Sequence, residues 1–156
     1  MKELLIRKAV DADLPAVNEI AREVHELHCT KRCDLYRRSY PVIDKERWEE
    51  YQEKAWVLVA ETEQKIVGYA VCFIKQRQDI AILIDHQTLF IDAFGVRKAC
   101  QRQGIGRQLL AAIKEKARDR GCERLELQVM SFNSEALSFY RRLGLREKAL
   151  ILEEDL

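Results

Sequence analysis

The sequence has few of the features that mark membrane-spanning or nucleic-acid-binding proteins. Its 156 residues carry 27 basic and 26 acidic side chains, so the formal net charge is only +1. A charge this close to zero produces no large field that would attract nucleic acid or an anionic membrane surface. No apolar run approaches the roughly 20 residues that a membrane-spanning helix needs. We therefore expect neither nucleic acid nor a membrane as a partner.

Cysteine is present, but not in a pattern that predicts disulfides or a metal site. The five cysteines are an odd number and include no C-x-x-C pair. His25, His28, Cys29 and Cys33 lie close together, yet the spacing H-x-x-H-C-x-x-x-C matches no standard zinc pattern. We expect free thiols in a reducing compartment and no bound metal.

The chain also lacks repeats, low-complexity segments and linkers. Its length suits one domain with a sizeable core, so residues 1–156 are interpreted as a single domain. The opening Met1-Lys2-Glu3 leads into a short mixed segment instead of the apolar stretch of a signal peptide. We therefore expect a cytoplasmic protein.

Hydrophobic residues recur with the period of strands in some segments and of helices in others, which predicts an α/β fold. Strands are expected at Leu4–Val10, Trp56–Glu61, Lys65–Lys75, Leu89–Val96, Arg124–Met130 and Leu145–Leu152. Helices are expected at Leu14–His28, Asp44–Lys54, Gly104–Arg120 and Asn133–Leu143. A turn is expected near Gln76–Asp79, and Ile80–Ile84 either extends the strand before it or begins the one after it.

The most informative stretch joins a strand to a helix. The strand Leu89–Val96 is followed by Gln101-Arg102-Gln103 and then by Gly104-Ile105-Gly106, where the helix starts. Backbone N–H groups in the first turn of a helix have no intrahelical partner, and the positive end of the helix dipole lies there. The two glycines carry no β-carbon that would keep ligand oxygens away, and Arg102 and Arg107 add positive charge. The stretch predicts a binding site for a phosphate or diphosphate.

Two common phosphate-binding motifs do not fit this stretch. A Walker loop requires G-x-x-x-x-G-K-[ST], and a dinucleotide fingerprint requires a third glycine where the chain has Leu109. The pattern that fits is [Q/R]-x-x-G-x-[G/A] after a strand, present here as RQGIGRQLL; SFNSEALSFYRRLGL is a second, independent motif. On these two motifs the chain resembles the GNAT superfamily of N-acetyltransferases. In motif it is most similar to the branch that acetylates the N-termini of ribosomal proteins.

The resemblance implies a fold and a co-substrate. The fold is a central mixed, mostly antiparallel sheet of six to seven strands, splayed between strands 4 and 5 and flanked by about four helices. The co-substrate is acetyl-CoA, whose pantetheine arm pairs with the backbone of Phe94, Gly95 and Val96. Its diphosphate is expected at Gln101, Arg102, Gln103, Gly104, Ile105, Gly106 and Arg107.

The second motif carries the expected proton donor. Asn133 and Tyr140 are seven residues apart, almost two helical turns, so their side chains share one face. In the family this asparagine contacts the coenzyme and this tyrosine donates a proton to the departing thiolate. Where the ribosomal branch has a glutamate, the chain has Gln128. The proton of the attacking amine is therefore expected to go to Glu126, to Asp92 or to solvent.

The resulting hypothesis is an N-acetyltransferase that works by direct attack of a primary amine in a ternary complex. The acceptor is a protein N-terminus or a small amine, and a homodimer is possible, as in other family members. The alternative is an acetyl-CoA-binding sensor or partner module without turnover, which has no need of a proton donor at Tyr140. By resemblance, the candidate acceptor contacts are His25, His28, Tyr36, Tyr40 and Trp48. An equal alternative for each of them is that it packs the lid helices onto the sheet.

Overall fold

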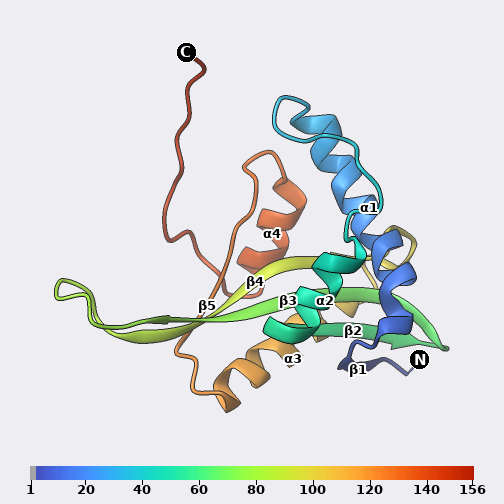
Figure 1. The fold of residues 1–156 in the computed structure, drawn as a ribbon, viewed down its shortest axis with the longest axis horizontal. Helices are drawn as coiled ribbons and strands as arrows, with labels where there is room; N and C mark the ends of the chain where they lie inside the picture. The colour runs from blue at the N-terminus through green and yellow to red at the C-terminus, as the bar shows by residue number, and fades with distance from the viewer. Residues whose placement is uncertain (1–2) are drawn as a thin grey trace.

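The computed structural model describes residues 3–156 as one five-stranded sheet with helices on both faces (Figure 1). Met1 and Lys2, which belong to the opening stretch interpreted above as no signal peptide, lie outside the described residues. The strands are β1 (Leu5–Lys8), β2 (Trp56–Thr62), β3 (Lys65–Arg77), β4 (His86–Val96) and β5 (Arg124–Leu127). The helices are α1 (Leu14–Lys31), α2 (Lys45–Lys54), α3 (Ile105–Asp119) and α4 (Ser134–Arg142), with short 3-10 turns at Asp11–Asp13 and Lys98–Cys100.

The strands follow one another across the sheet in chain order. β1, β2, β3 and β4 pair antiparallel, and β5 pairs with β4 in parallel. The parallel pair is connected by α3, as expected because a parallel connection has to cross over the sheet. The predicted mixed, mostly antiparallel sheet is thus confirmed. The predicted number of six to seven strands is wrong, since the described residues form five.

The missing strand is the last one that the periodicity predicts. After α4 the chain turns at Gly144, whose φ is +93°, and the segment predicted as strand Leu145–Leu152 has no regular secondary structure. In Figure 1 this segment, shown in dark red, runs away from the sheet on its own. A strand is defined by its ladder partner, and no segment within residues 3–156 pairs with it. β5 is also shorter than predicted, because it ends at Leu127 and not at Met130.

The long antiparallel pair of β3 and β4 is confirmed, but its connection differs from the prediction. β3 continues to Arg77, and the turn occupies residues 78–85. Ile80–Ile84 belongs to this loop and neither extends β3 nor begins β4. Ile82 and Ile84 are 91% and 86% exposed, so this apolar run does not contribute to the core.

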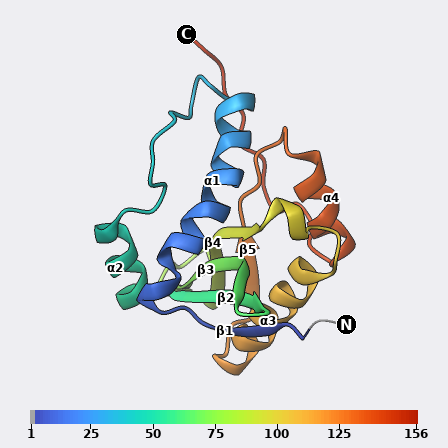
Figure 2. The ribbon, with the colours of Figure 1, turned by 90° about the vertical axis from the view of Figure 1, so that its right-hand side faces the viewer.

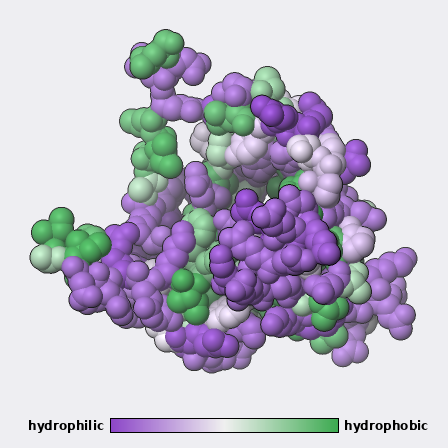
Figure 3. All heavy atoms as spheres, in the orientation of Figure 1, coloured by the Kyte–Doolittle hydropathy of each residue, from purple (hydrophilic) through white to green (hydrophobic). Residues whose placement is uncertain are grey.

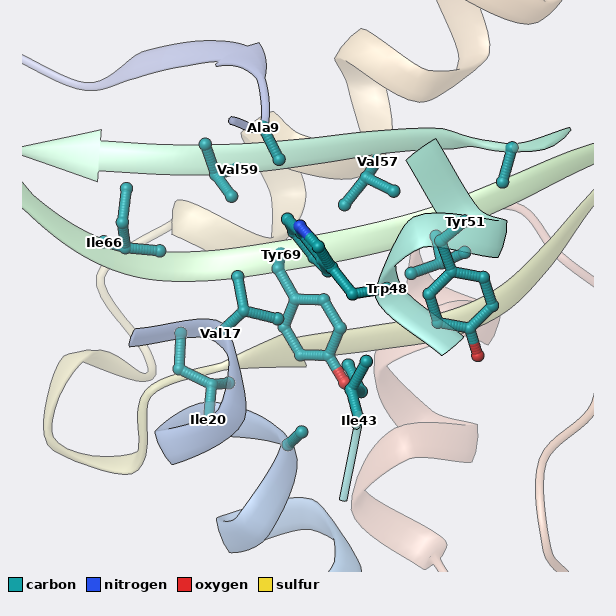
Figure 4. Close-up of a cluster of buried hydrophobic side chains, with 13 residues drawn as sticks. Ala9, Val17, Ile20, Ile43, Trp48, Tyr51, Val57, Val59, Ile66 and Tyr69 are labelled. Carbon is teal, nitrogen blue, oxygen red and sulfur yellow. The ribbon is translucent and has the colours of Figure 1, made fainter. Parts of the chain in front are cut away.

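The helices lie on both faces of the sheet (Figure 2), and a hydrophobic layer holds them to each face. On one face, α1 and α2 cover a cluster that includes Trp48 and Tyr69 (Figure 4). On the other face, α3 and α4 pack through residues such as Leu109, Ile113 and Tyr140. None of the helices within residues 3–156 is both long and apolar enough to cross a membrane.

Candidate functional site

The sheet opens between β4 and β5. The two strands pair only from Thr88 opposite Arg124 to Ile91 opposite Leu127. β4 continues to Val96 while β5 ends, so residues 92–96 have no strand partner on that side among the described residues. The opening lies between strands 4 and 5, where the resemblance implies a splay.

The open stretch of β4 presents backbone groups toward the missing neighbour. Alternate residues of a strand direct their backbone groups to the same side in an antiparallel ladder. The N–H of Arg97 donates to Val67 O at 2.8 Å, so Phe94 and Val96 direct theirs away from β3. The side-chain amide of Gln101 donates to Val96 O at 3.1 Å on that open side. Gln101 therefore ties the loop after β4 to the open edge.

The loop between β4 and α3 forms a nest of unpaired N–H groups. Gly104 is the N-cap of α3 with φ +82°, and Arg102 also has a positive φ, +61°. The first backbone bond of α3 runs from Gln108 N to Gly104 O at 3.0 Å. The N–H groups of residues 102–107 have no acceptor among the described residues. Residues 101–104 are exposed, so these donors are accessible to a ligand.

Glycine is required at Gly104, Gly106 and Gly95 for different structural reasons. A β-carbon on Gly104 would meet only Nε2 of Gln108, at an ordinary contact distance of 4.0 Å, so the positive φ alone requires glycine there. A β-carbon on Gly106 would lie 3.1 Å from Cζ of Phe139 in α4. One on Gly95 would lie 2.9 Å from Cγ2 of Ile20 in α1. Gly106 and Gly95 therefore allow close helix packing on the two faces of the open strand.

α4 places the predicted tyrosine beside the open strand. The ring of Tyr140 lies 6.0 Å from that of Phe94 and 5.1 Å from that of Phe139, measured between centroids. Burial raises the pKa of Tyr140 well above its usual value, so the phenol stays protonated. Its hydroxyl has no hydrogen-bond partner within the described part of the chain. Asn133 caps α4 by accepting from Ala136 N at 3.1 Å, which leaves its amide nitrogen for other contacts.

The two carboxylates considered as bases have different partners. Asp92 is the extra residue of a β-bulge, between Ala93 opposite Val71 and Ile91 opposite Cys72. The hydroxyl of Tyr51 in α2 donates to Asp92 at 3.2 Å. Burial, followed by the charge of Asp92, raises the pKa of Tyr51.

Glu126, by contrast, forms an ion pair with Lys148 of the C-terminal segment. No sequence signal pointed to the contact between Tyr51 and Asp92, which joins residues 41 positions apart.

Four of the five candidate acceptor contacts gather at the C-terminal end of α1. His25 lies edge-on to Tyr36 and Tyr40, with centroids 6.3 and 6.0 Å apart. His28 contacts Tyr36 at 5.0 Å and also Phe132 at 5.4 Å, next to Asn133. Phe132 was not singled out in the sequence. The contact joins the end of α1 to the loop that leads into α4.

Trp48 is not part of this group. It is 2% exposed, belongs to the core under α2, and donates from Nε1 to Asp11 at 3.0 Å. For this residue the packing alternative is the right one. Residues 3–156 contain no group of three or more His, Cys, Asp or Glu side chains arranged to hold a metal ion.

A surface cavity of about 670 Å³ lies elsewhere, beside the start of α1 and the β2–β3 turn. Its lining includes Arg7, which forms ion pairs with both Asp13 and Glu61 of the same lining. It shares Arg97 and Cys100 with the approach to the α3 loop, but it contains none of the residues predicted to bind coenzyme or transfer a proton. Most of its charged groups already pair with one another, including Arg97 with Glu19, so the splay remains the better candidate.

Comparison with known proteins identifies the family. Residues 16–145 match the model of the acetyltransferase (GNAT) family. Thialysine N-epsilon-acetyltransferase of Sus scrofa is 25% identical over 154 residues, which cover 94% of this chain and 86% of that protein. The uncharacterized N-acetyltransferase MJ1530 of Methanocaldococcus jannaschii is 29% identical over 150 residues, covering 95% and 81%.

Solved structures agree with this result. A mutant form of the BH1408 protein from Bacillus halodurans superimposes with a TM-score of 0.94 at 30% identity, over 97% of this chain and 99% of that one. The aminoglycoside N-acetyltransferase AAC(6')-Iy, solved in complex with CoA, has a TM-score of 0.72 at 15% identity over 100% and 96%, a likeness of fold alone. The chain therefore belongs to the GNAT family of acetyltransferases.

Proposed function

We propose that this protein transfers the acetyl group of acetyl-CoA to a primary amine by direct attack within a ternary complex. The observation that carries the proposal is that three separate devices meet at the open end of the sheet. These are the unpaired N–H groups of residues 102–107, the open edge of β4 and the partly buried phenol of Tyr140. A phosphate-binding module alone has no use for the phenol.

The unpaired N–H groups of residues 102–107 form a cradle that suits the diphosphate of the coenzyme. Accessible N–H donors at the start of a 15-residue helix favour an anion through both hydrogen bonds and the helix dipole. Arg102 and Arg107 are exposed and add positive charge. The backbone N–H groups of Phe94 and Val96 are available to a ligand that lies along β4 as a further strand would. Acetyl-CoA supplies the acetyl thioester on which the amine acts.

Tyr140 is proposed to hold a proton at the leaving sulfur. A thiol has a pKa near 8.5 and an unperturbed tyrosine one near 10, so complete proton transfer costs about 2 kcal/mol. Burial raises the pKa of Tyr140 further, which makes complete transfer still less favourable. A hydrogen bond that strengthens as charge develops on sulfur avoids most of this cost. The role is therefore that of a strong hydrogen-bond donor.

We assign the base to Asp92, acting on the amine directly or through water. Asp92 stands two residues before Phe94 on the open stretch of β4, whereas Glu126 lies in the paired stretch and is bound by Lys148. We expect Asp92→Asn to change the pH dependence of kcat/KM and Glu126→Gln to leave it unchanged. A shift with Glu126→Gln alone would move the assignment to Glu126, and no shift with either would leave the proton to solvent.

The acceptor is proposed to be a small amine or a protein N-terminus. Thialysine N-epsilon-acetyltransferase acts, by its name, on the side-chain amine of an amino acid, and this supports testing small amines. The motif similarity to the ribosomal-protein branch supports peptides, although Gln128 replaces the expected glutamate. An α-amine with a pKa of about 7.7–8.0 loses its proton far more readily than a lysine side chain at about 10.4.

The test is a turnover screen with acetyl-CoA, in which free thiol is measured. The panel combines peptides with varied N-termini, amino acids, polyamines and aminoglycosides. We expect thiol release that depends on one class of amine. Binding of acetyl-CoA, measured by calorimetry, without amine-dependent release across the panel would favour the sensor alternative. Failure to bind acetyl-CoA would overturn the proposal entirely.

A further inference from the structure

β4 contains an irregularity that determines which face of the sheet Asp92 occupies. In the ladder with β3, Ala93 lies opposite Val71. Ile91 lies opposite the next residue of β3, Cys72, so Asp92 is an extra residue between two ladder positions. A regular strand would place residues 91 and 93 on the same face. Here Ile91 packs with the cluster under α3, whereas Ala93 packs with the cluster under α1 and α2. The bulge thus allows Asp92 to face α2, as bulges beside functional sites commonly redirect a side chain.

α2 supplies the side chain that binds this carboxylate. The outer surface of α2, near the centre of Figure 3, is hydrophilic, and its two buried side chains, Trp48 and Tyr51, face the sheet. The hydroxyl of Tyr51 donates to Oδ2 of Asp92 at 3.2 Å. Burial, together with the negative charge of Asp92, raises the pKa of Tyr51. The phenol therefore stays protonated and remains a hydrogen-bond donor.

The contact leaves one oxygen of the carboxylate free. Asp92 is exposed, and its Oδ1 has no hydrogen-bond or ion-pair partner among residues 3–156. Tyr51, by contrast, is 8% exposed, and its ring lies edge-on to that of Phe73 with the centroids 6.1 Å apart. An exposed side chain without partners samples several rotamers. The fixed donor on Oδ2 therefore restricts the carboxylate, while Oδ1 stays available to an amine.

The proposed proton donor lies toward the other face of the sheet. Tyr140 packs with the cluster under α3, and its ring lies 6.0 Å from that of Phe94. Asp92, bound by Tyr51, is reached from the α2 side. An amine that enters from the α2 side therefore meets a carboxylate, while the sulfur leaves toward the phenol of Tyr140. The direction of the Asp92 carboxylate decides whether this arrangement works.

We propose that Tyr51 is a positioning residue for the acetyl transfer, which acts by holding the carboxylate of Asp92 toward the attacking amine. The inference rests on the proposed function, in which Asp92 accepts the proton of the amine. Tyr51 keeps its own proton and takes no part in the transfer itself. A misplacement of about 1 Å in a reacting group can lower a rate about a hundredfold, so the loss of this hydrogen bond has a measurable effect on turnover.

The first test compares two substitutions that each remove one hydroxyl. Tyr51→Phe should lower kcat about tenfold or more, while KM for acetyl-CoA changes less than about twofold. In the Asp92→Asn background the same substitution should change kcat less than about twofold, because no carboxylate remains to be positioned. Tyr69→Phe is the matched control, since Tyr69 belongs to the same buried cluster (Figure 4) and its hydroxyl has no hydrogen-bond partner among residues 3–156. This control should keep the kcat of the parent.

Three kinetic results would overturn the proposal. A loss of kcat in Tyr51→Phe that persists in the Asp92→Asn background would mean that Tyr51 acts independently of the carboxylate. An unchanged kcat in Tyr51→Phe would mean that the carboxylate needs no support. An equal loss in Tyr69→Phe would mean that packing of the cluster, and not the hydrogen bond, sets the rate.

A second measurement tests the contact without turnover. The ¹³C resonance of Cζ in Tyr51, assigned from its absence in Tyr51→Phe, reports the surroundings of the hydroxyl. It should move in Asp92→Asn and stay in place in Asp85→Asn, which neutralises an exposed carboxyl of the β3–β4 loop. A resonance that does not move in Asp92→Asn would overturn the contact itself. If the contact is present but no amine supports turnover, the proposed function fails, and the role of Tyr51 fails with it.

Discussion

At the scale of single residues, the candidate site depends on a few side chains whose surroundings set their chemistry. The phenol of Tyr140 is kept protonated by burial, and the backbone of Gly104 is held in a conformation that other residues rarely adopt. The RQGIGRQLL and SFNSEALSFYRRLGL motifs pointed to both residues in the sequence. The contact between Gly106 and Phe139 was not predictable, because no local pattern reports which helix packs against a glycine 33 positions away.

We expect Tyr140→Phe to lower turnover by about a hundredfold with little change in acetyl-CoA affinity, because it removes only the hydroxyl. Ser138→Ala removes an exposed hydroxyl from the same helix and should leave turnover unchanged. Steady-state kinetics and calorimetry on both variants make the comparison. Full activity in Tyr140→Phe would show that the leaving sulfur takes its proton from elsewhere.

Gly104→Val should abolish acetyl-CoA binding, because a β-branched residue does not tolerate φ +82° and the cradle has to rearrange. Gly121→Val is the matched control, since Gly121 has φ +75° at the other end of α3, with no atom within 4 Å of an added β-carbon. Both variants should lose stability to a similar extent in urea unfolding. Only Gly104→Val should lose binding, and normal affinity there would contradict the assignment of the cradle.

At the scale of elements, the helices were predictable and the strand edges were not. Asp44 caps α2 by accepting from Arg47 N at 2.8 Å, and α3 ends just before Gly121, as their residue types predict. Such signals are local and act within one turn. Whether an apolar run becomes a strand depends on a distant partner, which is why Ile80–Ile84 and Leu145–Leu152 were assigned wrongly.

The junction of β1 with α1 should depend on pH through Asp13. The hydrogen bond from Arg7 lowers the pKa of this nearly buried carboxyl below its unfolded value, about 3.9. Its contribution is thus complete above that value and is lost as the pH falls toward the folded pKa. Asp13→Asn should cost about 2 kcal/mol at pH 7, and the difference from the parent should shrink near pH 3.

Urea unfolding at the two pH values measures this effect. Asp34 is an exposed carboxyl whose pKa is lowered in the same way by Arg32, so Asp34→Asn serves as the control and should change stability little at either pH. If Asp13→Asn lowers the free energy of unfolding equally at pH 7 and pH 3, the side chain stabilises the protein through packing and not through the ion pair.

The packing of α1 on the open strand should depend on Gly95. An added methyl group would lie 2.9 Å from Cγ2 of Ile20 and 3.1 Å from Cε1 of Tyr69, closer than ordinary contact allows. Gly95→Ala should therefore destabilise the protein by about 1–3 kcal/mol. Gly68→Ala, whose nearest contact would be 3.3 Å, should cost less. Thermal unfolding ranks the two, and the reverse order would mean that α1 moves aside freely.

At the scale of the whole molecule, the two sequence motifs are brought together by contacts that span the chain. The open edge of β4, the start of α3 and the ring of Tyr140 come from segments that only the fold unites. The sequence was sufficient to predict the α/β class, the four helices and the splay, because the motifs specify a family. It was not sufficient to predict that residues 145–152 form no strand, since strand formation depends on a partner outside the segment itself.

The early end of β5 has a consequence for access to the site. The side-chain alternation of β5 continues in sequence as far as Met130, and in the observed register Met130 would stand opposite Phe94. Three more residue pairs would then occupy the backbone N–H of Phe94 and close the opening between β4 and β5. Because β5 ends at Leu127, the backbone of β4 beyond Ile91 stays open to a ligand on that side. The length of β5 thus determines how much of β4 a ligand can reach.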